Sequence, residues 1–275
     1  MTPRALRPYV AVFRARFQLL LQYRAAALAG FGTQCWWGAI KVMVFTAFIT
    51  GSASSPMTLR QTIDYIWLGQ ALLMMLPWSA DTELARMVRS GDIGYERLRP
   101  LDTYAYWYAR AVARRTATPL LRAVPMVVAV GIILPSLGFG RWGLSAPAGV
   151  PAALLFAISL VLVIALASAF STLLDVLVVA TLSERGINTF VAPLATVFSG
   201  SLVPLPFLPD WAQVVLRNQP FAGLLDFPLR IYSGQLVGLP ASAALVRQLL
   251  WAIVFVVGGR AITARVLARL QVQGG

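Results

Sequence analysis

The sequence predicts an all-α integral membrane protein, and three observations support this fold class. Hydrophobic residues make up 59% of the 275 residues and charged residues only 12%, whereas about 25% of a typical soluble domain is charged. Six apolar stretches are candidates for helices of about 20 residues that cross the ~30 Å hydrocarbon layer of a membrane. The arginines gather mainly in polar segments between these stretches, as they do at the ends of membrane helices. We expect one transmembrane domain over residues 1–275.

The first 25 residues are expected to form an amphipathic helix at the membrane surface. Apolar side chains recur there at three- and four-residue steps, and polar side chains fall on the opposite side of the helix. The apolar positions are Leu6, Tyr9, Phe13, Phe17 and Leu20, and the polar positions are Arg7, Arg14, Gln18 and Gln22. A helix of this kind lies along the interface with its arginines toward the lipid headgroups.

The chain is expected to cross the membrane six times, so that both termini lie on the same side. The predicted spans are residues 26–50, 63–79, 118–137, 151–177, 188–205 and 242–262. The segments on the side of the termini hold most of the arginines. The other side holds only Arg60, Arg141, Arg217, Arg230 and Arg247. Positive charge marks the cytoplasmic side of a membrane protein. We therefore expect a multi-pass protein of the cytoplasmic (inner) membrane with both termini in the cytoplasm.

Residues 81–115, between the second and third predicted spans, form the longest polar segment. This segment contains seven arginines and five of the chain's ten acidic residues. Residues 82–88 have the composition of a helix, Gly91 is placed as its C-terminal cap, and Pro100 with Asp102 marks a break before a second helix. We expect a cytoplasmic helix, a tight connector and another helix. The alternative is a solvated loop whose arginines only fix the topology.

Residues 201–240, between the fifth and sixth predicted spans, are too long for a tight turn and too apolar for a solvated loop. Prolines alternate there with Trp211, Phe221, Phe227 and Tyr232. We expect short half-helices at the outer interface, with the aromatic side chains at headgroup depth. Alternatively, these aromatic residues form an ordinary interfacial belt with no part in gating.

Residues with catalytic chemistry are scarce. The chain has no histidine, a single cysteine (Cys35) and no G-x-x-x-x-G-K-[ST] motif, so it lacks the sequence of a P-loop ATPase. We expect no enzymatic activity and no cofactor in this chain. The net charge of +13 agrees with cytoplasmic arginines that meet anionic lipid. Membrane lipid is therefore an expected partner, and nucleic acid is not.

Two charged residues lie within predicted spans, and such residues often mark a polar route or an interior pair. They are Lys41 in the first span, toward the outer face, and Asp175 in the fourth, toward the inner face. Because their depths differ, we do not expect a mutual salt bridge. Lys41 can extend its side chain to the nearest interface instead.

A few hydroxyl, amide and sulfur-bearing residues lie on the second and fifth spans, which the family resemblance described below implies to line a transport route. These pathway candidates are Trp67, Gln70, Met74, Thr189, Thr196 and Ser199. Their mainly apolar character suits an amphiphilic or hydrophobic cargo. The alternative is ordinary helix packing by these side chains.

Two motifs carry a resemblance over nearly the whole chain. The inner segment reads GDIGYERLRPL, and the outer segment reads LVPLPFLPDWAQVVLRNQPFAGLLDFPLRIYSG. With the surface helix and the six spans, they resemble the type-2, exporter-type permease subunits of ABC transporters. More narrowly, the chain is similar to small permeases encoded with a separate ATPase. This resemblance implies a permease dimer, formed with a second copy or a paralogue, above two cytoplasmic ATPases that hold ATP and Mg²⁺.

The resemblance also implies that residues 81–115 couple the ATPase to the membrane spans. Leu84, Met87 and Val88 form an apolar stripe that suits a groove on a partner, and the arginines suit orienting ion pairs. The expected coupling residues are Leu84, Met87, Arg89, Gly91, Ile93, Leu98, Arg99 and Pro100. An efflux permease is therefore the first hypothesis. The second is a non-transporting membrane scaffold or sensor that docks a regulatory partner on the same segment.

Overall fold

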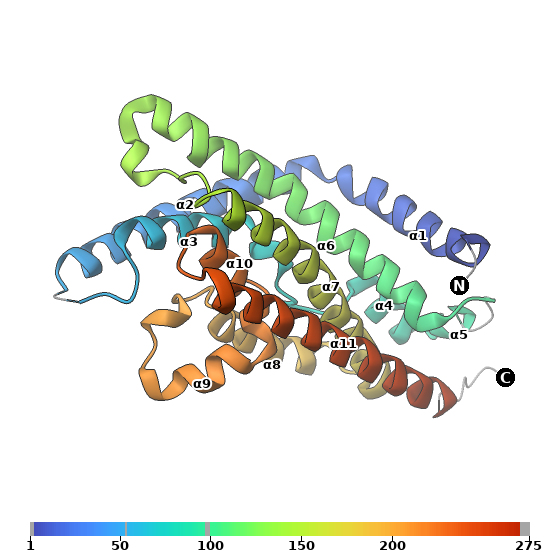
Figure 1. Ribbon diagram of the computed structural model, residues 1–275. Coiled ribbons are helices and arrows are strands. Elements are labelled where there is room, and N and C mark those ends of the chain that lie inside the picture. The colour runs from blue at the N-terminus through green and yellow to red at the C-terminus, as the bar shows by residue number, and fades with distance from the viewer. Residues whose placement is uncertain (1–2, 53, 97–99, 270–275) are drawn as a thin grey trace.

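A computed structural model describes residues 3–52, 54–96 and 100–269, and the regular structure in these residues is helical (Figure 1). The α-helices are α1 (Pro3–Leu21), α2 (Arg24–Thr50), α3 (Leu59–Ala71), α4 (Thr82–Ser90), α5 (Ile93–Glu96), α6 (Thr103–Val128), α7 (Val150–Thr181), α8 (Glu184–Phe198), α9 (Asp210–Asn218), α10 (Asp226–Tyr232) and α11 (Gly238–Arg269). Short 3₁₀ or π turns are η1 (Leu73–Met75), η2 (Ala129–Ile133), η3 (Pro135–Phe139), η4 (Gly140–Trp142), η5 (Leu205–Phe207) and η6 (Pro220–Gly223). The expected all-α class is confirmed.

Helices α6 and α7 lie at the centre of the bundle. α6 packs against α1, α2, α3 and α7, and α7 packs also against α4, α10 and α11. The main apolar core lies between these helices and includes Trp67, Leu166 and Leu229. Both ends of the described chain lie at the same end of the bundle as α4 and α5, and α9 lies toward the opposite end (Figure 1).

Three helices are long and apolar enough to cross a membrane: Thr103–Ile133, Val150–Thr181 and Gly238–Ala268. They contain most of the third predicted span and all of the fourth and sixth, each within a longer helix. α2 covers the first predicted span with 27 residues. α3 and α8 have only 13 and 15 residues, fewer than the about 20 that a straight crossing needs.

The second and fifth predicted spans differ most from expectation. Residues 63–79 are not one helix, because α3 ends at Ala71, the 3₁₀ turn η1 follows, and the chain is irregular up to Asp81. Pro77 cannot donate the backbone hydrogen bond that a continued helix would require. α8 ends at Phe198 rather than at residue 205, and Gly200 then adopts a left-handed conformation with φ 80°. Pro193 lies inside α8 without ending it.

The expected N-terminal helix is present as α1, which packs against α6. Its Phe13 and Phe17 rings stack with a centroid distance of 5.6 Å, and Arg7 and Arg14 are exposed. These positions agree with the predicted amphipathic pattern. The chain then breaks at Gln22 and Tyr23 before α2 begins.

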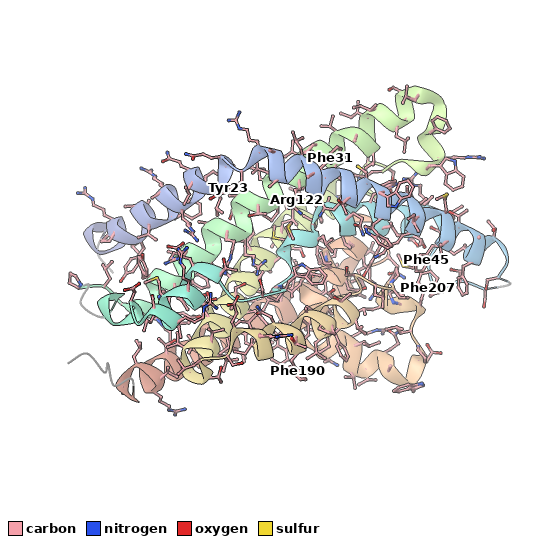
Figure 2. The ribbon with its side chains drawn as sticks, turned by 180° about the vertical axis from the view of Figure 1, so that it is seen from behind. Tyr23, Phe31, Phe45, Arg122, Phe190 and Phe207 are labelled. Carbon is pink, nitrogen blue, oxygen red and sulfur yellow. The ribbon has the colours of Figure 1, made fainter. Side chains whose placement is uncertain are left out.

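Residues 201–240 form the expected short helices, but these occupy two different environments. Trp211 of α9 is 84% exposed, as expected for an interfacial residue, whereas every residue of α10 is buried. The Phe227 and Tyr232 side chains are therefore covered by the chain itself rather than exposed to lipid, and their predicted headgroup depth stays a prediction. They are held inside because α10 packs against α7 and α3. η5 is fixed to α2 by an edge-on contact between Phe207 and Phe45 with a centroid distance of 5.5 Å (Figure 2).

Candidate functional site

Asp81 is the N-cap residue of α4 and the centre of a cluster of ion pairs. Its carboxylate accepts a hydrogen bond from the backbone N–H of Glu83 at 2.9 Å, which caps the helix N-terminus. The residue is nevertheless buried, with 5% of its surface exposed. A buried carboxylate is expensive unless opposite charges and hydrogen bonds compensate it. Its surroundings provide both.

Three arginines from two helices surround this carboxylate. Arg110 and Arg114, one turn apart on α6, approach Asp81 to 3.4 and 3.2 Å. Arg16 of α1 approaches it to 3.7 Å and also pairs with Glu83. Burial alone would raise the pKa of Asp81, but Arg114, Arg110 and Arg16 outweigh that effect and hold the pKa below its ordinary value of 3.8. Asp81 is therefore ionised at neutral pH.

Asp175 joins α7 to the same cluster. Its carboxylate accepts a hydrogen bond from the backbone N–H of Asp81 at 2.6 Å and lies 3.8 Å from Arg114. One residue earlier, the backbone N–H of Ala80 donates to the side chain of Asn188 on α8 at 3.1 Å. The start of α4 is thus bonded to α1, α6, α7 and α8. We call Arg16, Asp81, Glu83, Arg110, Arg114 and Asp175 the Asp81 cluster.

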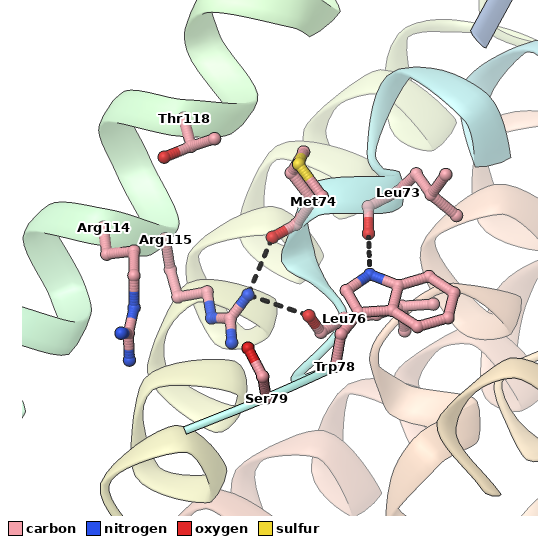
Figure 3. Close-up of a pocket in the computed structure, with 8 residues that line it drawn as sticks. All are labelled: Leu73, Met74, Leu76, Trp78, Ser79, Arg114, Arg115 and Thr118. Carbon is pink, nitrogen blue, oxygen red and sulfur yellow. Dashed lines mark hydrogen bonds between the residues drawn. The ribbon is translucent and has the colours of Figure 1, made fainter. Parts of the chain in front are cut away.

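A cavity of about 510 Å³ lies beside the cluster (Figure 3). It is lined by Leu73, Met74, Leu76, Trp78, Ser79, Arg114, Arg115 and Thr118. Arg115 is buried and donates to the backbone carbonyls of Met74 and Leu76 at 2.9 and 2.8 Å and to the hydroxyl of Ser171. These carbonyls lie where the helix of α3 and η1 has ended, so neither has the partner that a continued helix would supply. The carbonyl of Leu76 also accepts from the backbone N–H of Trp78 at 3.0 Å. Arg115 therefore replaces the missing helical hydrogen bonds.

Two of the expected coupling residues do not face a partner. Leu84 is 1% exposed and Ile93 is 6% exposed, and both pack against Trp107, Val176 and Val179. The expectation that Leu84, Met87 and Val88 form a partner-facing stripe is corrected for Leu84, which is buried, while Val88 is half-buried and also packs against this group. The apolar face of α4 is needed to attach the helix to its own bundle.

The other expected coupling residues that the structure describes lie on the more exposed face of residues 81–115. Met87 is half-buried, and Arg89 is exposed and pairs with Glu184 of α8 at 2.7 Å. Gly91 has φ 81° and ends α4 as predicted. Pro100 is exposed, and Leu98 and Arg99 lie outside the described residues. Asp102 caps α6 by accepting a hydrogen bond from Ala105 at 2.7 Å, in agreement with the predicted break.

The pathway candidates near α3 are not brought to one surface within this chain. Trp67 lines an apolar cavity of about 540 Å³ next to α2, and its indole N–H donates to the carbonyl of Trp142 at 2.7 Å. Gln70 lines a smaller pocket beside Lys41. Met74 lines the cavity that contains Arg114 and Arg115. A shared route through these three residues stays a prediction.

The pathway candidates on α8 differ in exposure. Thr189 is exposed, and Thr196 is half-buried and donates to the carbonyl of Ala192 at 2.7 Å. Ser199 is fully buried just after the helix, and its hydroxyl accepts a hydrogen bond from the backbone N–H of Ser201. Only the two threonines therefore remain near a surface that a cargo could reach.

Lys41 and Asp175, the two charges expected within spans, are separate from each other, as predicted. Lys41 donates to the backbone carbonyl of Ser201, whereas Asp175 is buried in the Asp81 cluster. The sequence did not identify Arg16, Asp81, Arg110, Arg114 or Arg115 as site residues. A polar residue directly before a helix is a capping signal, so Asp81 could have been recognised from the sequence. Its distant arginine partners could not.

The turn at Gly91 leads to a testable prediction. A Cβ at Gly91 would meet no atom within 4 Å, so the cost of Gly91→Val should come only from its left-handed backbone. We expect a loss of about 1 kcal/mol in the free energy of unfolding, measured by SDS titration in detergent. Gly91→Asn is the matched control and should lose less, because asparagine tolerates this conformation. Equal stability in all three proteins would contradict the assigned cap.

Comparisons with known proteins add no family to this description. No protein-family model, no curated protein and no solved structure matches the chain.

Proposed function

We propose that the chain is the membrane-spanning permease subunit of an ATP-driven exporter of the ABC type. It pairs with a second permease, either another copy or a paralogue, and a cytoplasmic ATPase dimer supplies ATP hydrolysis with its own Mg²⁺. The chain crosses the cytoplasmic membrane six times, with α3 and α8 in broken or shortened crossings. Both termini are cytoplasmic, as the arginine distribution favours.

The observation that carries this proposal is the attachment of α4. This short helix is bonded through Asp81 to α6 and α7, which are two of the three helices that are apolar enough to cross a membrane. Arg16 adds α1 to the same attachment. A displacement of α4 by a partner would therefore move the central helices with it. Such a connection is what a coupling element requires.

The free face of the segment suits a protein partner with acidic side chains. Arg86 is exposed and Met87 is half-buried, whereas the exposed Arg89 already pairs with Glu184. This face therefore combines the positive charge of Arg86 with one adaptable apolar side chain. Leu84 and Ile93 contribute by fixing the helix rather than by touching the partner. α4 lies at the end of the bundle that also holds both ends of the described chain (Figure 1).

An amphiphilic or hydrophobic cargo is favoured by the cavity beside α2. The residues that line it are Cys35, Ala39, Val42, Met43, Trp67, Ala129, Val130, Leu134, Phe139 and Trp142, and none is charged. Its volume of about 540 Å³ is within the range of about 300–1,000 Å³ for small-molecule pockets. A multiply charged cargo would lose its hydration there without compensation.

Site-specific photo-crosslinking tests the proposal. A photoreactive residue in place of Arg86 should crosslink in cells to a protein whose sequence contains a P-loop, identified by mass spectrometry. The same residue in place of Arg141, which is exposed in η4, is the control and should not. A crosslink from the photoreactive residue at position 86 to a kinase or another regulator would favour the scaffold or sensor function instead. No crosslink at Arg86 would reject α4 as the docking element.

A further inference from the structure

Three of the five arginines expected on the outer side converge on one small cavity. Arg217 comes from the end of α9, Arg230 from α10 and Arg247 from α11. Outer segments of membrane proteins are usually poor in arginine. Three positive charges from separate helices repel one another in one cavity, so an anionic ligand or an acidic side chain is expected to compensate them.

Acidic residues of the described chain compensate only one of these three arginines. Arg230 is the one that is compensated, because it pairs with Asp226 at 3.1 Å and donates to Gln235 at 2.5 Å. Asp226 also accepts a hydrogen bond from the hydroxyl of Tyr65 at 3.0 Å. Arg217 and Arg247 have no ion pair among the described residues, and no acidic side chain lines the cavity. Two positive charges in the lining of the cavity thus have no acidic partner among the described residues.

The size and walls of the cavity restrict the ligand. Its volume of about 240 Å³ is below the range of about 300–1,000 Å³ for drug-sized ligands, so it suits an ion or a headgroup. Its other lining residues, including Phe227, Leu236 and Pro240, are apolar. The guanidinium fork matches the oxygens of a phosphate, with paired hydrogen bonds.

Neighbouring surface residues favour a lipid over a free anion. Val214, Leu239 and Val246 are 72%, 86% and 55% exposed on α9 and α11, the helices that carry Arg217 and Arg247. Acyl chains can cover such an apolar surface while the phosphate occupies the cavity. We propose that the Arg217–Arg230–Arg247 cavity binds the phosphate of an anionic phospholipid headgroup. This site does not depend on the chain being a transporter.

Lipid retention in native mass spectrometry tests the proposal. The full chain is purified in mixed micelles of a neutral detergent with equal amounts of phosphatidylglycerol and phosphatidylcholine. The wild type should retain phosphatidylglycerol preferentially, and the double variant Arg217→Gln with Arg247→Gln should retain it about tenfold less. The control double variant Arg141→Gln with Arg185→Gln removes two exposed arginines elsewhere and should behave as the wild type. Because Arg217 is exposed, Arg217→Gln alone serves if the double variant does not fold.

A second arm adds inorganic phosphate to separate the two sources of phosphate. Stabilisation of the wild type by inorganic phosphate without preferential retention of phosphatidylglycerol would assign the cavity to a free anion and overturn the lipid proposal. Equal retention of phosphatidylglycerol by the wild type and the Arg217 and Arg247 variants would overturn it as well. Neither result bears on the α4 crosslink, so this proposal and the proposed function can fail separately.

Discussion

Replacing Asp81 with asparagine should destabilise the folded chain by about 3 kcal/mol. Asparagine caps a helix about as well as aspartate, so the variant keeps the hydrogen bond to Glu83 and removes only the charge. Arg16, Arg110 and Arg114 then share a site with less negative charge. Removal of one partner from a buried ion pair typically costs about 3–5 kcal/mol. The lower end applies because the Arg16 and Arg114 side chains are 20% and 21% exposed.

Asp102→Asn is the matched control for this experiment. Asp102 also caps a helix and pairs with Arg260 at 3.4 Å, but its side chain is 51% exposed. An exposed pair contributes only about 0–1 kcal/mol, so SDS titration in detergent should separate the two variants clearly. Equal losses for Asp81→Asn and Asp102→Asn would show that the Asp81 cluster is not a buried electrostatic centre.

The same variant predicts a pH dependence. The pKa of Asp81 is lowered in the folded chain from its ordinary value of 3.8, so its stabilising charge is present above pH ~4 and is lost as the pH falls through the folded pKa. The stability difference between the wild type and Asp81→Asn should therefore hold near pH 7 and shrink below about pH 4. A difference that grew on acidification would contradict the direction of this shift.

Local sequence signals account for much of the fold. The long apolar runs in α7 and α11 are strong helix signals, and the spacing of Phe13 and Phe17 predicts the amphipathic helix α1. Gly91 and Asp102 mark helix ends because their roles depend on backbone conformation and adjacent residues. These features involve residues close in sequence, so the sequence alone can show them.

The candidate site depends on contacts that no local signal contains. Arg16, Asp81, Arg114 and Asp175 are separated by tens of residues, and their meeting depends on how α1, α6 and α7 pack. The sequence showed Leu84 on an apolar stripe but not which surface that stripe contacts. A partner groove and the chain's own core demand the same residue types, and the structure assigns Leu84 to the core.

The break after α3 shows the same limit. Pro77 indicates that a helix cannot continue unchanged, yet the apolar composition of residues 63–79 still suggested a full span. The chain accommodates this break because Arg115, 38 residues later than Pro77, donates hydrogen bonds to the carbonyls of Met74 and Leu76. Hydropathy treats that arginine only as a charge near the end of a span, so it cannot predict this role.

Arg115→Met should therefore cost about 2 kcal/mol of unfolding free energy. The variant leaves the carbonyl of Met74 without its Arg115 donor, and an unsatisfied buried acceptor costs about 1–3 kcal/mol. The carbonyl of Leu76 loses its Arg115 donor but keeps a hydrogen bond from the backbone N–H of Trp78 at 3.0 Å. Relief from burying a cation offsets part of this loss, and Ser171 keeps its own hydrogen bond to Ala167 at 2.7 Å. The freed segment before Asp81 should also become accessible to protease.

Arg122→Met is the matched control, because it makes the same change two turns later on α6. Arg122 lies against α2, where its guanidinium occupies the space that a Cβ at Gly30 would take (Figure 2), and its buried Nε has no hydrogen-bond partner among the described residues. Arg122→Met should leave the free energy of unfolding unchanged or raise it, because the Nε of Arg122 donates to no acceptor among the described residues. SDS titration and limited proteolysis of both variants decide the matter. If Arg115→Met is no less stable than Arg122→Met, the carbonyls of η1 do not depend on Arg115, and α4 is fixed by the Asp81 cluster alone.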